Sequence, residues 1–134
     1  MTSRFLNPQQ LLAVHQLLDR VADRQRQDFG NIVSDTKADG SLITACDRWS
    51  DEALVNGLSA LAPAEFTLSE EGEKACPSSS AFWVVDPLDG TTNFAAGIPY
   101  WAISVARFVD GRPTEAFLDI PSLRQRIVAI RGRG

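Results

Sequence analysis

The first thirty residues carry apolar side chains at helical spacing. Asn7-Pro8 predicts a helix start, because proline fits the first turn, and Gly30 predicts its end. The apolar positions between them recur every three or four residues: Leu11, Leu12, Val14, Leu18, Val21, Ala22 and Phe29. We therefore predict a long helix with one face turned toward the core.

The next segments alternate between turn residues and a second helical pattern. Residues 31–45 predict a loop or a hairpin through Gly40. Asp47 is then expected to cap a second helix that runs to about Leu61 and is closed by Pro63. Residues 71–80 contain glycine, proline and three serines, which is typical of a loop.

Short apolar runs in the rest of the chain predict strands. They are residues 66–69, 82–85, 101–108, 114–119 and 126–130. The last three are separated by the turn signals Asp110-Gly111 and Pro121-Ser122, so we expect an antiparallel meander whose last edge is exposed. Helices and antiparallel strands in this order predict an α+β fold.

Composition and charge narrow the functions that this chain can have. With 134 residues, 44% of them hydrophobic, it can bury about two-thirds of its unfolded surface, enough for one domain. Its net charge of −4 provides no basic field, so we expect neither a nucleic-acid polymer nor a membrane as partner. It contains no apolar stretch of about 18 residues and no signal-peptide layout, which predicts a cytoplasmic location.

The cysteines and the single histidine suggest no metal or redox site. Cys46 and Cys76 lack C-x-x-C spacing, and we expect both to be reduced. His15 falls inside the first helix without a cysteine or histidine partner at metal-binding spacing, so a packing or surface role is expected.

The segment WVVDPLDGTTNF, residues 83–94, carries the strongest chemical signal. Residues 82–85 predict a strand buried on both faces, after which Pro87 should stop the sheet ladder. Asp86, Asp89 and the Leu88 carbonyl could then face one point, and such hard oxygen ligands suit Mg²⁺.

The residues that follow predict a place for an anion. Gly90 allows close approach of the backbone, and Thr91 and Thr92 are good N-cap residue types, so their N–H groups could face a phosphate. From these residues alone, an ordinary turn with no catalytic role remains an equal alternative.

The same segment resembles the signature of the inositol monophosphatase family, an apolar strand that ends in D-P-[IL]-D-G-T-[TS]-N-[FY]. Further similarity lies in residues 37–47, in Ser69-Glu70-Glu71 and in residues 97–108 and 129–134. The resemblance implies the layered helix and antiparallel-sheet half of a sugar-phosphatase αβαβα sandwich. It spans residues 11–134, so the whole chain is expected to be the N-terminal, metal- and phosphate-binding part, with the C-terminal half and its Trp-Asp motif absent.

The resemblance also implies a ligand set. Glu70, Asp86 and the Leu88 carbonyl would bind one Mg²⁺, and Asp86 and Asp89 a second. The absent half would supply a further carboxylate, so the site is expected to bind metal weakly by itself. Ser69, where glycine is common, and Ala95-Ala96 depart from the family pattern without touching these ligands.

Catalytic roles follow from the same resemblance. Thr91, oriented by Asp47, would hold and activate a water, and Glu70 would share the task of general base. The N–H groups of Gly90, Thr91 and Thr92 would stabilise the phosphoryl oxygens. Lys37 and Glu71 have subsidiary roles in local charge and metal hydration.

We therefore expect a Mg²⁺-dependent phosphomonoester hydrolase that acts on a small polyol or sugar phosphate, with inositol 1-phosphate favoured. The alternative is a non-catalytic fragment that binds metal or phosphate, or a half that needs a complementary chain. Because the sheet edge is expected to be exposed, the chain should pair either with a second copy of itself, as a homodimer, or with such a complementary C-terminal half.

Overall fold

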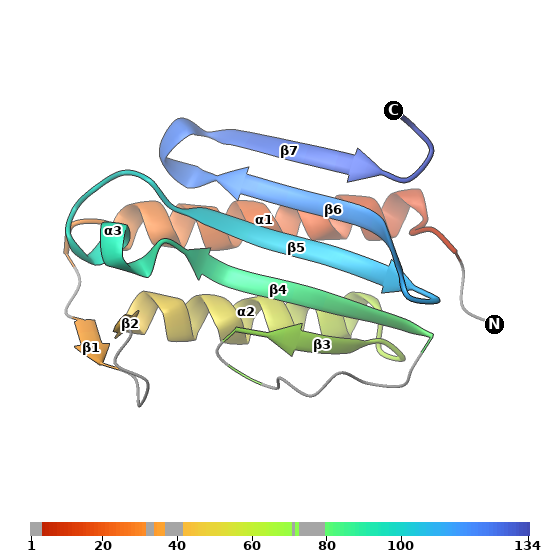
Figure 1. Ribbon diagram of the computed structural model, residues 1–134, viewed down its shortest axis with the longest axis horizontal. Helices are drawn as coiled ribbons and strands as arrows, with labels where there is room; N and C mark the ends of the chain where they lie inside the picture. Colours follow the sequence, from red (N-terminus) through yellow and green to blue (C-terminus); the bar gives the residue numbers. More distant parts are fainter. Residues whose placement is uncertain (1–3, 32–33, 37–41, 71, 73–79) are drawn as a thin grey trace.

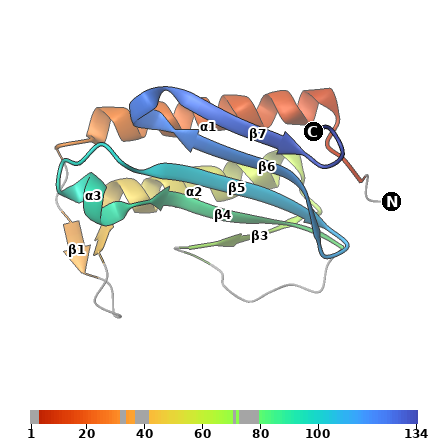
Figure 2. The same cartoon turned by 45° about the horizontal axis from the view of Figure 1, so that its top comes forward.

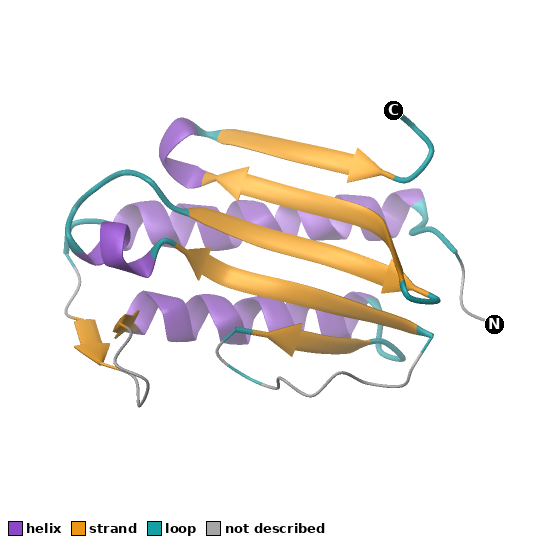
Figure 3. Cartoon of the chain, in the orientation of Figure 1, coloured by secondary structure: helices purple, strands orange, loops and turns teal. Residues whose placement is uncertain are grey.

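The computed structural model describes residues 4–31, 34–36, 42–70, 72 and 80–134. Figures 1 and 3 show two long helices packed behind a sheet, with short elements gathered at one end. The elements are α1 (Pro8–Asp28), β1 (Ser34–Thr36), β2 (Leu42–Thr44), α2 (Ala45–Leu61), β3 (Phe66–Ser69), β4 (Ala81–Asp89), α3 (Thr91–Ala95), β5 (Ala102–Val109), β6 (Arg112–Ile120), the 3-10 helix η1 (Pro121–Leu123) and β7 (Gln125–Ile130).

The main sheet has five strands in the order β3-β4-β5-β6-β7. β3 runs parallel to β4, whereas the other neighbouring pairs are antiparallel. Both long helices lie on the same face of this sheet (Figures 1 and 2). The expected α+β class is confirmed.

The core lies between this sheet face and the two helices. It is built from the apolar stripe of α1, the inner face of α2 and alternate residues of β4, β5 and β6. Its largest members include Leu18, Leu54, Leu58, Trp83 and Phe117, each at most 2% exposed. The opposite sheet face lies open, with Val84, Leu118 and Ile127 at 37%, 38% and 59% exposed.

The first helix forms as the apolar pattern predicts, with two corrections. Asn7 and Gln10 close a capping box at its start, which satisfies backbone donors that a helix end leaves open. The helix ends at Asp28 rather than at Gly30, because Phe29 already leaves the helical conformation. Leu12 is 57% exposed and faces away from the core, since helical spacing places it on the side of α1 opposite the buried stripe of Val14, Leu18 and Val21.

The start of α2 differs from the expectation in the identity of the cap. Thr44 is the N-cap, and Asp47 is the third residue of the helix. The two side chains form a capping box, because Thr44 Oγ1 accepts from the Asp47 N–H at 3.1 Å while Asp47 Oδ2 accepts from the Thr44 N–H at 2.9 Å. The predicted end at Leu61 is confirmed.

Strand β4 departs from the expectation at two points. Its burial alternates, and it is therefore buried on one face rather than on both. It also continues through Pro87 to Asp89, because the pairing with β5 shifts: Asp86 faces Ser104 and Asp89 faces Ala102. Two residues of β4 thus lie opposite one residue of β5, so Pro87 produces a bulge instead of ending the strand.

The meander of β5, β6 and β7 is confirmed. Asp110 and Gly111 adopt φ values of +51° and +78°, the paired positive φ of a tight hairpin turn. Pro121 opens η1, which turns the chain into β7 at the edge of the sheet. The expected exposed edge is also confirmed, with Ile127 and Val128 at 59% and 39% exposed.

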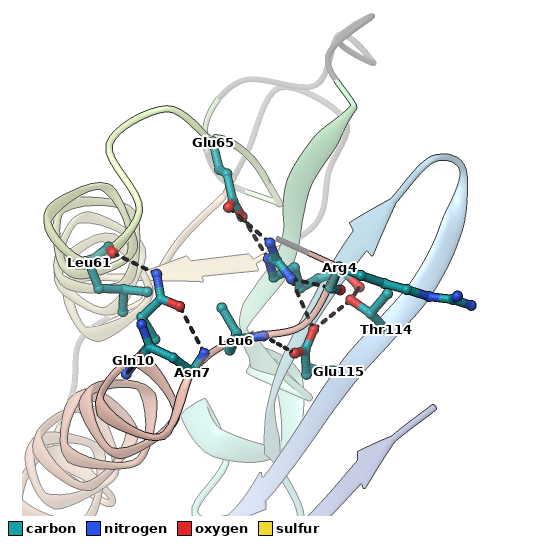
Figure 4. Close-up of polar contacts among 9 residues, drawn as sticks. Arg4, Leu6, Asn7, Gln10, Leu61, Glu65, Thr114 and Glu115 are labelled. Carbon is teal, nitrogen blue, oxygen red and sulfur yellow. Dashed lines mark hydrogen bonds and ion pairs between the residues drawn. The ribbon is translucent and has the colours of Figure 1, made fainter. Parts of the chain in front are cut away.

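A buried polar cluster joins the N-terminal segment to the far end of this sheet (Figure 4). Arg107, 2% exposed, bridges Glu65 at 2.8 Å and Glu115 at 3.3 Å, and Glu115 accepts from the Leu6 N–H at 2.6 Å. Although burial disfavours the charge, hydrogen bonding and attraction to Glu65, together with Glu115, raise the pKa of Arg107. The pairing satisfies charges that would be costly if left alone.

Several smaller expectations have outcomes within the described residues. β1 and β2 pair as a hairpin, although Gly40 lies outside the described residues. Cys46 is a free buried cysteine, and Cys76, with most of the expected 71–80 loop, lies outside them as well. His15 packs edge-on against Phe117 at 5.7 Å, which confirms a packing role. None of the helices described is long and apolar enough to cross a membrane.

Candidate metal and phosphate site

The candidate site lies at the end of the sheet where β4 ends and α3 and α2 begin (Figure 1). Its central contact joins two residues that are 44 positions apart: Thr91 Oγ1 donates to Asp47 Oδ1 at 2.7 Å. Asp47 is 1% exposed, and its other oxygen accepts from the N–H and the hydroxyl of Thr44. The carboxylate is therefore held by its own helix cap while its free side faces Thr91.

Thr91 also lies against the strand end. Its hydroxyl is 3.2 Å from the Leu88 carbonyl, in addition to its bond to Asp47. A threonine hydroxyl has one proton and two lone pairs. Thr91 uses the proton to donate to these acceptors, so the lone pairs of its oxygen can still accept a hydrogen bond. That geometry suits a water donor placed beside Thr91.

Gly90 makes the turn from β4 into α3. It adopts φ +100°, and an added Cβ would come within 2.8 Å of the Tyr100 carbonyl oxygen. Gly90, and not Thr91 or Thr92, is the N-cap of α3, because only glycine accepts this conformation and this close approach. The expectation of a threonine cap was wrong, while the helix start at Thr91 places the first N–H groups at the strand end.

The expected acidic ligands lie on neighbouring strands. Asp86 and Asp89 flank the bulge of β4, and Glu70 follows the end of β3, where its N–H donates to the Val85 carbonyl at 3.2 Å. Glu70 is thus adjacent to Asp86 across the parallel pair. Among the residues that the structure describes, no three His, Cys, Asp or Glu side chains lie together in a group able to hold a metal ion. Lys37 and Glu71 lie outside the described residues.

Two residues that support the candidate site from beneath were not predicted from the sequence. Gln25 of α1 and Trp101, just before β5, are hydrogen-bonded to each other beneath the site at 2.9 Å. Gln25 follows Leu18, Val21 and Ala22 at helical spacing, and a polar residue on an apolar stripe was the available signal. Thr44 was detectable as well, from its position three residues before Asp47.

This fold and site define a layered α+β protein in which a glycine turn and a threonine bonded to a buried carboxylate lie at the end of an inner strand that carries Asp86 and Asp89. The chain belongs to the inositol monophosphatase family, whose model matches residues 6–134. The resemblance read from the sequence is thereby confirmed.

Relatives and solved structures that resemble this chain carry several different protein names. The chain is 36% identical over 120 residues to histidinol-phosphatase of Mycobacterium tuberculosis, covering 88% of this chain and 46% of that protein. It is 37% identical over 112 residues to inositol-1-monophosphatase of Rhizobium meliloti, covering 81% and 42%. The structure of the extragenic suppressor protein suhB from Bartonella henselae matches with a TM-score of 0.84 at 30% identity, covering 92% of this chain and 50% of that one. The chain thus spans about half the length of these proteins.

Proposed function

We propose that this chain provides the metal- and phosphate-binding part of a Mg²⁺-dependent phosphomonoester hydrolase. Its substrate class would be a small polyol or sugar phosphate. The observation that carries the proposal is the 2.7 Å hydrogen bond from Thr91 to the buried Asp47, at the end of a strand that also presents Asp86 and Asp89.

That hydrogen bond supports a role in water activation. A water that donates to Thr91 Oγ1 can pass its proton to that oxygen while the threonine proton moves to Asp47 Oδ1. The water oxygen then bonds to phosphorus as the bond from phosphorus to the alcohol oxygen breaks; the departing alcohol oxygen takes a proton from solvent water, and Asp47 returns its proton to solvent. Glu70, exposed and next to Asp86, is placed to share the task of general base.

The donor types at the strand end fit Mg²⁺. Asp86, Asp89, Glu70 and the Leu88 carbonyl would hold it, all of them hard oxygen ligands. Glu70 and Asp89 are exposed, so their side chains can turn toward Asp86 without breaking core packing. When bound, the ion would lower the pKa of a bound water and offset the charge of the phosphate.

Backbone groups complete the proposed site. The first N–H groups of a helix have no acceptor within the helix, and those of Gly90, Thr91 and Thr92 would bind the phosphoryl oxygens. We assign Lys37 and Glu71 subsidiary roles in local charge and metal hydration.

The relatives leave the organic part of the substrate open. One is named for histidinol phosphate and another for inositol 1-phosphate, at nearly equal identity to this chain. We propose inositol 1-phosphate as the first substrate, because the Thr-Thr-Asn-Phe sequence of residues 91–94 is closest to that branch.

The test is phosphate release by the full chain from inositol 1-phosphate and histidinol phosphate, with and without Mg²⁺. Asp86→Asn should abolish Mg²⁺-dependent release by removing one charge from the ligand set. Asp110→Asn is the matched control, because Asp110 is an exposed turn residue at the opposite end of β4 and should leave release unchanged.

The alternative of a non-catalytic half makes a different prediction. The chain would then release no phosphate, yet would still bind Mg²⁺ or phosphate, with affinity reduced in Asp86→Asn. The observation that favours this alternative is that the chain covers only 46% and 42% of the length of the two relatives. Loss of both release and binding would count against the proposed site itself.

A further inference from the structure

Gln25 connects α1 to three other parts of the molecule beneath the candidate site. Its side chain is 0% exposed. Nε2 donates to the Pro87 carbonyl at 2.8 Å and to Ser50 Oγ at 2.9 Å, and Oε1 accepts from Trp101 Nε1 at 2.9 Å. Both ends of the amide are therefore engaged.

These partners determine which way the amide points. An indole N–H can only donate and a proline carbonyl can only accept, so the amide oxygen faces Trp101 and the nitrogen faces Pro87. The reversed amide would place like groups against each other at both contacts. Gln25 thus has one orientation that satisfies all of its buried partners.

The contact with Pro87 fixes the bulge of β4. Pro87 lies between Asp86 and Leu88, where the pairing with β5 shifts by one residue. At this interruption of the sheet, the Pro87 carbonyl receives a hydrogen bond from Gln25 of α1. The direction in which Asp86 and the Leu88 carbonyl leave the strand therefore depends on this bond.

The contact with Trp101 supports the other side of the turn. An added Cβ at Gly90 would lie 3.3 Å from Trp101 Cα and Cβ, which shows how closely the two backbones approach. The indole ring stacks on Phe29 at 4.8 Å and meets Phe94 of α3 edge-on at 5.0 Å. By holding the indole N–H, Gln25 also orients the wall against which Gly90 and α3 pack.

We infer that Gln25 is a positioning residue that holds residues 86–94 in the shape required to bind metal and phosphate. It does not touch the proposed ligands and acts through Pro87 and Trp101. Its effect on binding rests on the proposed function, whereas its effect on the local backbone can be measured independently.

The test compares Gln25→Leu with two controls in the full chain. Ser50→Ala removes one partner of Gln25 but keeps the contacts to Pro87 and Trp101, and Gln16→Leu places the same change on the exposed face of α1. Hydrogen exchange should become about tenfold faster in residues 88–94 of Gln25→Leu, because a buried hydrogen-bond pair is lost. Residues of β5 and β6 should exchange as in the parent, and neither control should change the 88–94 segment.

Calorimetric titration with Mg²⁺ gives the second measurement. Loss of a residue that orients ligands typically lowers metal affinity about 10- to 100-fold, and we expect this for Gln25→Leu but not for Ser50→Ala. If Gln25→Leu does not fold, Trp101→Phe replaces it, because phenylalanine keeps an aromatic ring at this position but lacks the indole N–H that orients the amide.

The outcomes separate the two proposals. Unchanged exchange at residues 88–94, or an equal increase throughout β5 and β6, would overturn the positioning role. Faster local exchange together with a parent chain that binds no Mg²⁺ would uphold the positioning of the backbone and would overturn the proposed metal function.

Discussion

Single hydrogen bonds hold the polar side chains of the candidate site. Asp47 combines two tasks, since one oxygen closes the cap of α2 and the other accepts from Thr91. A carboxylate fixed by its own helix costs little further entropy when it orients a hydroxyl. The catalytic proposal therefore depends on the Thr91 hydroxyl rather than on the bulk of that side chain.

Replacing Thr91 by valine should lower phosphate release at least about 100-fold, because it removes the proton path while keeping the shape of the side chain. Thr91→Ser should restore much of the rate. Thr92→Val is the matched control, since Thr92 is exposed and only its backbone N–H has a proposed role. Steady-state phosphate release measures all three, and a parental rate in Thr91→Val would show that the hydroxyl is dispensable.

Cys46 provides a pH-dependent prediction. Burial, followed by the neighbouring charge of Asp28, raises the pKa of its thiol from 9.0 to about 12. The unfolded chain ionises this thiol above pH 9 while the folded chain keeps it protonated, so its contribution to stability is complete below pH 9 and declines as the pH rises toward 12.

The free energy of unfolding should therefore fall more steeply with pH in the parent than in Cys46→Ala, by up to about 1.4 kcal/mol per unit between pH 9 and 12. Urea denaturation at a series of pH values measures the two slopes. Below pH 9, Cys46→Ala lowers stability by removing a buried side chain, so only the difference in slope above pH 9 is diagnostic. Parallel curves would contradict the raised pKa.

Among the secondary-structure elements, the junction of β4 and α3 does most to shape the site. A proline bulge and a left-handed glycine occur within four residues there. Each feature interrupts regular structure, and each is stabilised by contacts from elsewhere in the chain: Gln25 for the bulge, and Tyr100 and Trp101 for the glycine.

Gly90→Ala should destabilise the chain more than Gly97→Ala does. Both glycines have positive φ, +100° and +77°, so both substitutions carry backbone strain of about 1–2 kcal/mol. Only at Gly90 would the new Cβ meet backbone, the Tyr100 carbonyl at 2.8 Å, whereas nothing lies within 4 Å at Gly97. Thermal unfolding of both variants isolates the steric part, and equal losses would show that this close approach can relax.

At the scale of the whole molecule, the described helices α1 and α2 both cover the same face of the main sheet. Leu118 and Ile127 are register partners on the open face, near the unpaired edge of β7. Exposed apolar surface next to unpaired strand groups promotes association. The net charge of −4 is too small to prevent it.

We expect the 14.6 kDa chain to elute above its monomer mass in size-exclusion chromatography with light scattering. Ile127→Lys should shift it toward the monomer by placing a charge on the open face. Gln125→Lys adds the same charge to an exposed polar position of the same strand and should have little effect. A parent chain that is monomeric at all concentrations would refute this expectation.

Local patterns were sufficient to predict much of this protein. The apolar spacing of α1, the Asp110-Gly111 turn and the meander that follows depend on interactions between near neighbours, which periodicity and turn chemistry report directly. The signature of residues 86–94 likewise indicated the family, because its residues are consecutive in the sequence and can be recognised without knowledge of the fold.

Features that depend on distant contacts were decided by the tertiary structure alone. The bulge at Pro87, the one-sided burial of β4 and the buried contacts of Gln25 each require knowledge of which segment lies opposite. Sequence spacing cannot reveal the hydrogen bond between residues 25 and 87, because chain topology and core packing bring them together. The contact between residues 47 and 91 was expected from the family resemblance, but not from spacing. The sequence by itself thus determined which residues are capable of the chemistry, and the fold decided how they are held.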